Sequence, residues 1–223
     1  MAEDTIPDWF RQEHERNNIW QPPFDYGLIA RELDALEEGI RNGWKEANVQ
    51  AYLKSKPHLF DGLYRHGHGT FVFSEMRFGS TYVADWVVGN GHSGGLLWNL
   101  IELECPQSPP FMKDGHFSEP TRKGTNQIHD WRDWISKNIA FVQRPKSQHG
   151  LGLHDLDGFA HGMVVVGRRA LYESSEGVAR YNEARNTSRN QNRIEVISYE
   201  SLIDKMRFHV KRWAAGNAEQ SEE

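Results

Sequence analysis

The chain has 223 residues, 26% of them charged and 38% hydrophobic, and its formal net charge is -5. This length can bury one sizeable core, and the composition excludes an intrinsically disordered chain. The net negative charge argues against a protein that coats nucleic acid through bulk positive potential. The single cysteine, Cys105, excludes an internal disulfide framework and a cluster of thiolate metal ligands.

The charges are unevenly spread along the chain. Residues 161–215 carry ten Lys and Arg against six Asp and Glu, whereas residues 1–60 carry seven against eleven. The basic part fits a phosphate-facing surface and, equally, a solvated helix surface. No signal peptide follows the acidic start, and no run approaches the roughly 20 apolar residues that span a bilayer. We therefore expect a cytoplasmic protein that makes no contact with a membrane.

Residues 1–47 are expected to form an arm followed by a helix. The arm mixes charges with aromatic residues that should dock onto the core or onto another subunit: Trp9, Phe10, Trp20 and Phe24. Apolar residues at helical spacing predict a helix over residues 28–41, which Gly43 ends. Asn48 is the expected N-cap of a second helix, and Pro57 forces the chain out of it near Lys56.

Three strands follow, over residues 70–78, 82–88 and 96–104. The turn residues Gly79 and Ser80 separate the first two, and a Gly-rich hairpin connection over residues 89–95 separates the second from the third. Short connections of this kind predict an antiparallel meander. Prolines then open an irregular stretch up to Thr125, which is long enough to be a substrate-facing loop.

The second half of the chain alternates helices and strands. The spacing of apolar residues predicts an amphipathic helix over residues 126–142, and the fully apolar run 162–167 is typical of a strand at the centre of a sheet. A helix, a short strand and a closing helix are expected over residues 178–187, 194–197 and 199–213. The expected fold is α/β, with a mixed sheet of three antiparallel strands plus a fourth central strand, flanked by helices. Residues 48–215 would form this domain, and residues 216–223 an acidic disordered tail.

Two of the predicted strands carry acidic residues among apolar neighbours. Asp85 lies in the second strand, and Glu102 and Glu104 share one face of the third because strand side chains alternate. A carboxylate in a buried strand carries a desolvation cost unless it is paired or binds a cation. Hard oxygen ligands suit Mg²⁺ or Mn²⁺, so this pattern indicates a divalent-metal site. The alternative is that Asp85 and Glu102 face solvent or an Arg partner.

The order of these elements resembles the PD-(D/E)xK nuclease core, and a set of short words narrows the resemblance to the Shedu antiviral nuclease domain over roughly residues 48–207. The words, in chain order, are Ser74-Glu75, Ala84-Asp85-Trp86-Val87, Ile101-Glu102-Leu103-Glu104-Cys105-Pro106, Gln127-Ile128-His129-Asp130-Trp131, Val166-Gly167-Arg168-Arg169 and Tyr199-Glu200-Ser201-Leu202. This resemblance implies a DNA endonuclease that depends on Mg²⁺ or Mn²⁺, cuts double-stranded DNA and acts in bacterial defence against phage. It also implies a homo-oligomer, either a dimer or a tetramer.

The resemblance implies a metal-binding role for four residues. Asp85 and Glu102 would bind the metal through carboxylate oxygens, with the Leu103 carbonyl completing one face. Glu75 on the first strand resembles the family's additional acidic residue and would bind the same metal or a second one. An exposed strand glutamate is the competing interpretation of Glu75.

Two further residues would take part in catalysis. Glu104 stands where the superfamily pattern has lysine, and we expect it to act as general base or second ligand rather than as a solvated strand end. Gln127 resembles the glutamine of a related nuclease word and would orient the water or a phosphate. It can also be a plain residue at the start of a helix.

Two basic pairs are candidates for DNA binding. Arg122 and Lys123 are expected in the loop before the long helix, where they would anchor a phosphate. Arg168 and Arg169 end the central strand and would touch the DNA backbone. Solvated surface charge is the alternative for both pairs.

Two other functions remain open. A nuclease fold that has lost turnover would serve as a DNA-binding or regulatory module, and Glu104 is the residue that separates this possibility from an active enzyme. A glycosidase also uses paired carboxylates, but it would need no metal. Zinc binding by His66 and His68 lacks a paired ligand word.

Overall fold

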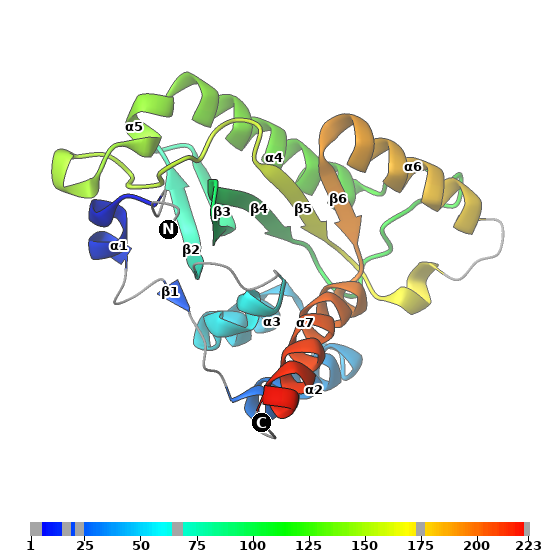
Figure 1. The fold of residues 1–223 in the computed structure, drawn as a ribbon. Helices are drawn as coiled ribbons and strands as arrows, with labels where there is room; N and C mark the ends of the chain where they lie inside the picture. Colours follow the sequence, from blue (N-terminus) through cyan, green and yellow to red (C-terminus); the bar gives the residue numbers. More distant parts are fainter. Residues whose placement is uncertain (1–5, 15–18, 21–24, 64–68, 173–176, 221–223) are drawn as a thin grey trace.

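The computed structural model describes residues 6–14, 19–20, 25–63, 69–172 and 177–220, with side chains for all of these except residues 19–20, 177–181, 209 and 211–220. Strands β1 to β6 form one sheet in the order of the sequence, and helices cover both of its faces (Figure 1). The elements are α1 (Asp8–His14), β1 (Ile19–Trp20), α2 (Tyr26–Arg41), α3 (Glu46–Ser55), η1 (Pro57–Leu63), β2 (Thr70–Phe78), β3 (Tyr82–His92), β4 (Gly95–Leu103), α4 (Glu119–Lys137), α5 (Ile139–Gln143), η2 (Lys146–Gln148), β5 (His161–Val165), η3 (Arg169–Tyr172), α6 (Gly177–Asn192), β6 (Ile194–Ile197) and α7 (Tyr199–Gln220).

The sheet is mixed, as the sequence predicts, but it is larger than expected. Strands β2, β3 and β4 form the antiparallel meander, and β5 and β6 continue it in parallel. The expectation of a four-stranded sheet is wrong, because the short strand β6 also pairs with β5, with Val164 opposite Val196. The two-residue strand β1 adds to the other edge. Strand β5 therefore lies inside the sheet, which explains its apolar sequence.

Each face of the sheet has its own apolar core. One core joins α1 and α4 to residues such as Phe71, Leu100 and Val164. The other joins α2, α3, η1 and α7 to residues such as Trp86 and Leu103. A sheet that is covered on both faces keeps its inner strands out of water. Among the described residues, no helix is both long and apolar enough to cross a membrane.

Strand β3 is longer than expected, because the Gly-rich run after Val88 is strand and not hairpin. A Cβ atom on Gly89 would lie 2.7 Å from the ring of Trp98 on the neighbouring strand. Glycine is thus required where the Trp98 indole lies flat against the backbone of β3. The turn itself is confined to the residues between His92 and Gly95.

Helix α4 begins earlier than expected, at Glu119, and it ends at Lys137, where Asn138 separates it from α5. Pro120 lies in the first turn, where a missing amide N–H costs nothing and a fixed φ favours the helix. Arg122 and Lys123 consequently lie on α4 and not in a loop. This correction matters for the site, because a helix holds their positions against the sheet.

Three other expectations about the helices need comment. Asn48 is not the N-cap of α3 but its third helical residue, and its side chain accepts a hydrogen bond of 3.1 Å from the amide of Lys45. Helix α7 continues beyond residue 213 to Gln220, and residues 221–223 lie outside the described part. The arm docks on its own core, because Phe10 is fully buried and its ring lies 4.7 Å from that of Phe71.

Candidate functional site

The site lies where strands β3 and β4 end their pairing. Their paired residues run from Trp86 opposite Ile101 towards the hairpin, and Asp85 stands just beyond the first pair. The Asp85 carboxylate bridges the strands, because Oδ2 accepts a hydrogen bond of 2.9 Å from the amide of Leu103. Burial raises the pKa of Asp85, and the hydrogen bond from Leu103 opposes that shift.

A relay from helix α3 fixes the other oxygen of Asp85. The Gln50 amide donates to Asp85 Oδ1 at 3.0 Å, and Gln50 Oε1 accepts a hydrogen bond of 2.6 Å from the buried Trp86 indole. Trp86 thereby fixes the orientation of the Gln50 amide, and Gln50 in turn fixes the orientation of the Asp85 carboxylate. Sequence reasoning missed Gln50, since its spacing on α3 says nothing about a contact with a strand 35 residues further along the chain.

Glu102 is the least satisfied carboxyl group of the site. Its residue is 4% exposed, and its Oε2 atom is buried with no hydrogen-bond partner among the described residues. Burial, followed by the charges of Asp85 and Glu104, raises the pKa of Glu102 to about 9. The protein alone therefore keeps Glu102 protonated at neutral pH, and a bound cation is what would ionise it.

Glu104 lies just past the end of β4 and is 5% exposed. Its backbone is tied down, because its amide donates to Val165 O at 2.8 Å and the Tyr199 hydroxyl donates to its carbonyl at 2.7 Å. Its carboxylate faces Lys123 of α4, whose Nζ lies 3.1 Å from Oε1. Burial raises the pKa of Glu104, and the bond from Lys123 opposes that shift. Glu104 is thus no solvated strand end.

A fourth carboxyl group, Glu46 in the first turn of α3, completes the acidic environment. Burial and then the charge of Asp85 raise the pKa of Glu46. Sequence reasoning missed Glu46 as well. Acidic residues are common in the first turn of a helix, so the position of Glu46 does not indicate a functional role.

The donor set fits a divalent cation in its charge and in its unpaired oxygen. Four carboxyl groups lie near one another, and Glu102 Oε2 has no donor of its own. Within the described residues, however, no three His, Cys, Asp or Glu side chains converge as a ready ligand group. The reason is that Glu104 is turned to Lys123 and Asp85 is held by Gln50 and Leu103. Asp85 and Glu102 are the pair that would hold the ion, and the Leu103 carbonyl remains a predicted ligand.

Two of the predicted site residues differ from their expected surroundings. Glu75 has a φ of 50°, its side chain is 62% exposed, and it pairs with Lys54 at 2.6 Å. In the pairing of β2 with β3 it stands opposite Asp85, between the pairs Ser74–Trp86 and Met76–Ala84, so the structure places its backbone beside the site while its carboxylate binds Lys54. Gln127 lies within α4 and not at its start, and its buried Oε1 atom has no hydrogen-bond partner among the described residues. An unpaired buried amide oxygen is costly, and the role of Gln127 stays a prediction.

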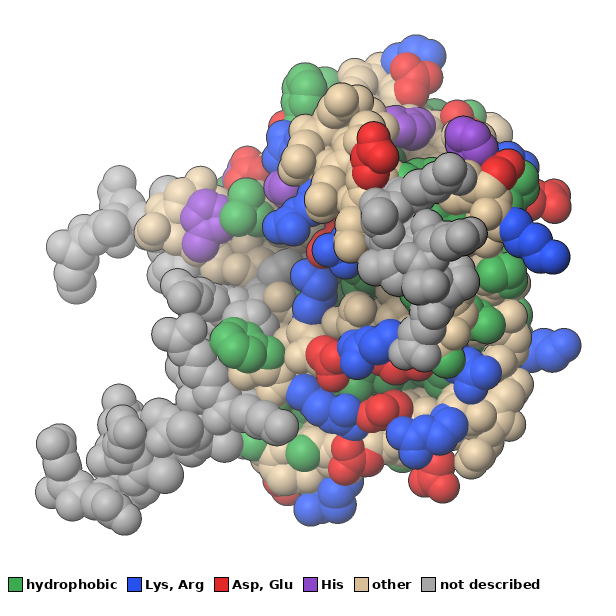
Figure 2. All heavy atoms as spheres, turned by 90° about the vertical axis from the view of Figure 1, so that its right-hand side faces the viewer, with side chains coloured by type: hydrophobic (Ala, Val, Ile, Leu, Met, Phe, Trp, Pro, Cys, Tyr) green, Lys and Arg blue, Asp and Glu red, His purple; other side chains and the backbone are tan. Residues whose placement is uncertain are grey.

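The predicted DNA-binding residues divide into two groups. Arg122 is exposed on α4 beside Lys123 and makes no ion pair within the described part of the chain. Arg169 is occupied, because it pairs with Asp204 at 2.6 Å, and Arg168 lies against the carbonyl of Arg41 at 3.5 Å. Figure 2 shows the same mixture over the face it views, where Lys and Arg alternate with Asp and Glu. His66 and His68 lie outside the described residues.

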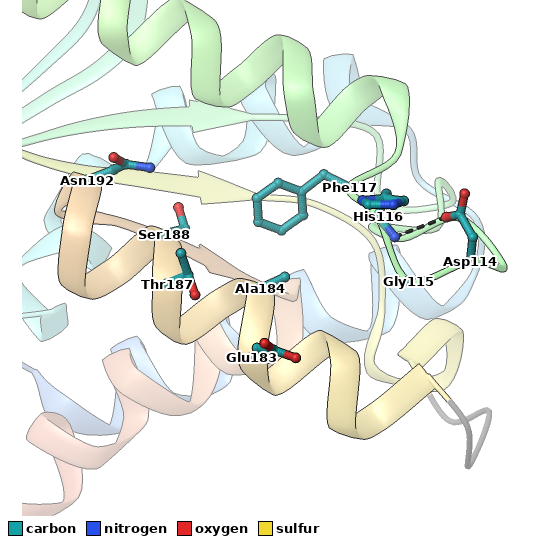
Figure 3. A pocket seen from close by; sticks show the side chains of 9 residues that line it. All are labelled: Asp114, Gly115, His116, Phe117, Glu183, Ala184, Thr187, Ser188 and Asn192. Atoms are coloured by element: carbon teal, nitrogen blue, oxygen red, sulfur yellow. Dashed lines mark hydrogen bonds between the residues drawn. The ribbon is translucent and has the colours of Figure 1, made fainter.

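A sizeable cavity of the described structure lies elsewhere. It has a volume of about 580 Å³ and separates the loop 114–117 from helix α6, with the Phe117 ring facing into it (Figure 3). Its charged lining residues are Asp114 and Glu183, beside His116. None of the carboxylates at the end of β4 lines it.

The comparison with known families identifies the family of this chain. The sequence model of the family described as Shedu protein SduA, C-terminal, matches residues 44–203, which contain every carboxyl group of the site. None of the curated proteins compared with the chain matches it. The match spans most of the sequence, from the start of the loop before α3 into α7, and the chain therefore belongs to the Shedu SduA C-terminal family.

Proposed function

We propose that this protein is an endonuclease that uses Mg²⁺ or Mn²⁺ to hydrolyse the phosphodiester bonds of double-stranded DNA in defence against phage. The single observation that carries the proposal is the orphan Oε2 atom of Glu102 beside the oriented carboxylate of Asp85. Two buried carboxyl groups with too few cationic partners can serve as the protein ligands of a metal ion. Membership of the Shedu SduA C-terminal family supports the defence role.

The arrangement of elements supports a PD-(D/E)xK type of core. An antiparallel meander from β2 to β4 carries the acidic residues, α4 crosses the sheet, and β5 then joins β4 in parallel. The carboxylates cluster at one end of the meander, between α3 and α4. We expect the protein to act in the cytoplasm, where phage DNA arrives, and to assemble as a homo-oligomer.

A divalent cation held by Asp85 and Glu102 would supply positive charge to the phosphate and make a water molecule more acidic. The protein's own groups do the rest. The water oxygen would form a bond to phosphorus while the bond between phosphorus and the leaving oxygen breaks. The water proton would pass to Glu104, and the leaving oxygen would take up a proton from solvent. Lys123 engages Oε1 of Glu104, and Oε2 makes no hydrogen bond within the described residues, so it can take that proton. Gln127 would orient the water through its unpaired amide oxygen, which accepts, or a phosphate oxygen through its amide nitrogen, which donates.

A second candidate is a DNA-binding or regulatory module that has kept the nuclease fold without turnover. One observation favours it, which is that Glu104 stands at the usual position of lysine while no complete ligand group is formed among the described residues. The buried orphan oxygen of Glu102 counts against it. In a protein that binds no metal, replacing Glu102 by a neutral residue would raise the stability of the fold. A buried glutamate kept at this position therefore favours a metal-binding function.

A cleavage assay separates the two candidates. Purified protein is expected to cut linear double-stranded DNA with Mg²⁺ or Mn²⁺ and not in EDTA, and Asp85→Ala or Glu102→Ala is expected to abolish cutting. DNA binding without cutting at any concentration of either metal would support the regulatory module. Equal cutting in EDTA, or by Asp85→Ala, would exclude the proposed mechanism.

A further inference from the structure

Lys123 is the cation that the carboxyl groups of the site share. Its ammonium lies 3.1 Å from Glu104 Oε1, and its charge acts on Asp85, Glu102 and Glu46 as well. Its side chain is 60% exposed, whereas that of Glu104 is 6% exposed. Lys123 thus reaches from the solvent side into a buried acidic cluster, which is where a DNA phosphate would approach.

The packing of helix α4 brings Lys123 to this position. The next residue, Gly124, faces the sheet so closely that a Cβ atom there would lie 2.8 Å from Val164 Cγ1 and 3.5 Å from Glu102 Cγ. Only a residue without a side chain permits this approach. Further along α4, Arg132 anchors the helix, because its guanidinium donates to the carbonyls of Ala160 and Asn192 at distances of 2.5 to 2.8 Å. The packing of α4 against the sheet therefore fixes the position of Lys123 beside Glu102.

We propose that Lys123 is a catalytic residue of this protein, because its exposed ammonium joins the buried carboxylate of Glu104 to the side from which a DNA phosphate would approach. This assignment rests on the proposed nuclease function and replaces the simpler role of a phosphate anchor. The ammonium fixes Glu104 from one side and stabilises the negative charge that develops on the phosphate from the other. Glu104 and Lys123 then work as a unit that combines a proton acceptor with a positive charge.

Two substitutions of Lys123 test the assignment. Lys123→Ala is expected to lower kcat for metal-dependent DNA cleavage by about 10²-fold with little change in KM, as expected when charge stabilisation of the transition state is lost. Lys123→Arg keeps a positive charge beside Glu104. It is expected to recover at least about tenfold of the lost activity, since a charge of the same sign again faces the phosphate.

The matched control is Lys137→Ala. Lys137 lies on the same helix, is 70% exposed and pairs only with Asp133 in the described structure, so its removal is expected to leave cleavage unchanged. Mn²⁺ binding measured by calorimetry gives a readout that does not depend on cleavage. Removal of a positive charge beside the carboxylates should leave Mn²⁺ affinity equal or higher in Lys123→Ala.

The outcomes distinguish this assignment from the proposed function. If Lys123→Ala cuts like the wild type, or loses Mn²⁺ affinity so that its role is only to hold the ligands, the assignment is wrong while the nuclease function stands. A raised KM with unchanged kcat would restore the phosphate-anchor role and overturn it too. If the wild type itself cuts no DNA with either metal, the proposed nuclease function is wrong, and so is the assignment of Lys123 to catalysis.

Discussion

Two buried glutamates in this molecule have opposite surroundings. Glu32 in α2 is 8% exposed, and its two oxygens lie 2.6 Å from Lys56 Nζ and 2.5 Å from His58 Nε2. Burial raises the pKa of Glu32, but the bonds from Lys56 and His58 outweigh it and leave the pKa below its usual value. Glu102 is buried to a similar degree, yet one of its oxygens has no partner among the described residues and its pKa rises to about 9.

The difference teaches how to separate a structural acid from a functional one. A carboxylate that holds a fold is matched with cations, because an unmatched one destabilises the folded state. Glu102 stays unmatched beside Asp85 and Glu46, so the protein carries an electrostatic cost there that a metal ion would remove. This contrast supports the proposal that Glu32 stabilises the fold and Glu102 takes part in the reaction.

The largest expected effect is on cleavage. Asp85→Asn keeps the shape of the side chain but removes its charge, and it should lower metal-dependent cleavage by about 10²–10³-fold. Glu32→Gln removes a charge of the same kind from helix α2, where the carboxylate binds Lys56 and His58, and should leave cleavage intact at a temperature where the variant is folded. An equal loss of cleavage in Glu32→Gln and Asp85→Asn would contradict the distinction between a structural and a functional carboxylate.

The next effect concerns the relay that orients Asp85. Gln50→Leu removes the amide that donates to Asp85 Oδ1 at 3.0 Å and leaves the Trp86 indole without its acceptor. Outer partners of this kind typically contribute about 10–100-fold to metal affinity. We expect Mn²⁺ to bind more weakly by that factor in calorimetry. Unchanged Mn²⁺ affinity would show that the relay serves packing alone.

The two glutamates should also respond oppositely in stability. In EDTA at about pH 8, Glu102→Gln is expected to raise the free energy of unfolding by about 1–3 kcal/mol, because a neutral amide replaces an acid that must keep its proton. Glu32→Gln is expected to lower it by about 1–3 kcal/mol, since Lys56 loses its partner. Urea denaturation measures both. Destabilisation of both variants by the same amount would contradict the assignment.

The pH dependence follows from the signs of the two shifts. The pKa of Glu102 is raised on folding, so its contribution to stability is present below the usual value of 4.5 and is lost as pH rises towards about 9. The pKa of Glu32 is lowered, so its contribution is present above 4.5 and is lost as pH falls below that value. In EDTA, Glu102→Gln should therefore flatten the fall in Tm between about pH 5 and 9. If Tm falls with pH as steeply in Glu102→Gln as in the wild type, other titratable groups cause the fall.

The sequence predicted the strands and their acids better than the contacts between distant elements. Asp85 and Glu102 were predictable because each stands in an apolar strand, where a charge is conspicuous. Gln50 and Glu46 were not, because only the docking of α3 brings them to the site. Lys123 was predicted as a phosphate anchor in a loop, and its meeting with Glu104 depends on the early start of α4 and on Gly124.

Two fold errors have similar causes. The Gly-rich run after Val88 resembled a hairpin because glycine usually marks turns, whereas here Gly89 makes room for a tryptophan of the next strand. The segment 194–197 was correctly predicted as a strand. Its place in the sheet could not be known, since the pairing partner of a short strand is set by the connection that precedes it.

The most direct test of the central claim is a calorimetric titration of metal-free protein with Mn²⁺, repeated in buffers of different ionisation enthalpy. The wild type should bind Mn²⁺ and release protons at about pH 7.5, because ionisation of Glu102 must accompany binding. The Glu102→Gln variant should release none and bind far more weakly, whereas Glu32→Gln should match the wild type. Equal binding and equal proton release by Glu102→Gln would contradict a metal site at Asp85 and Glu102.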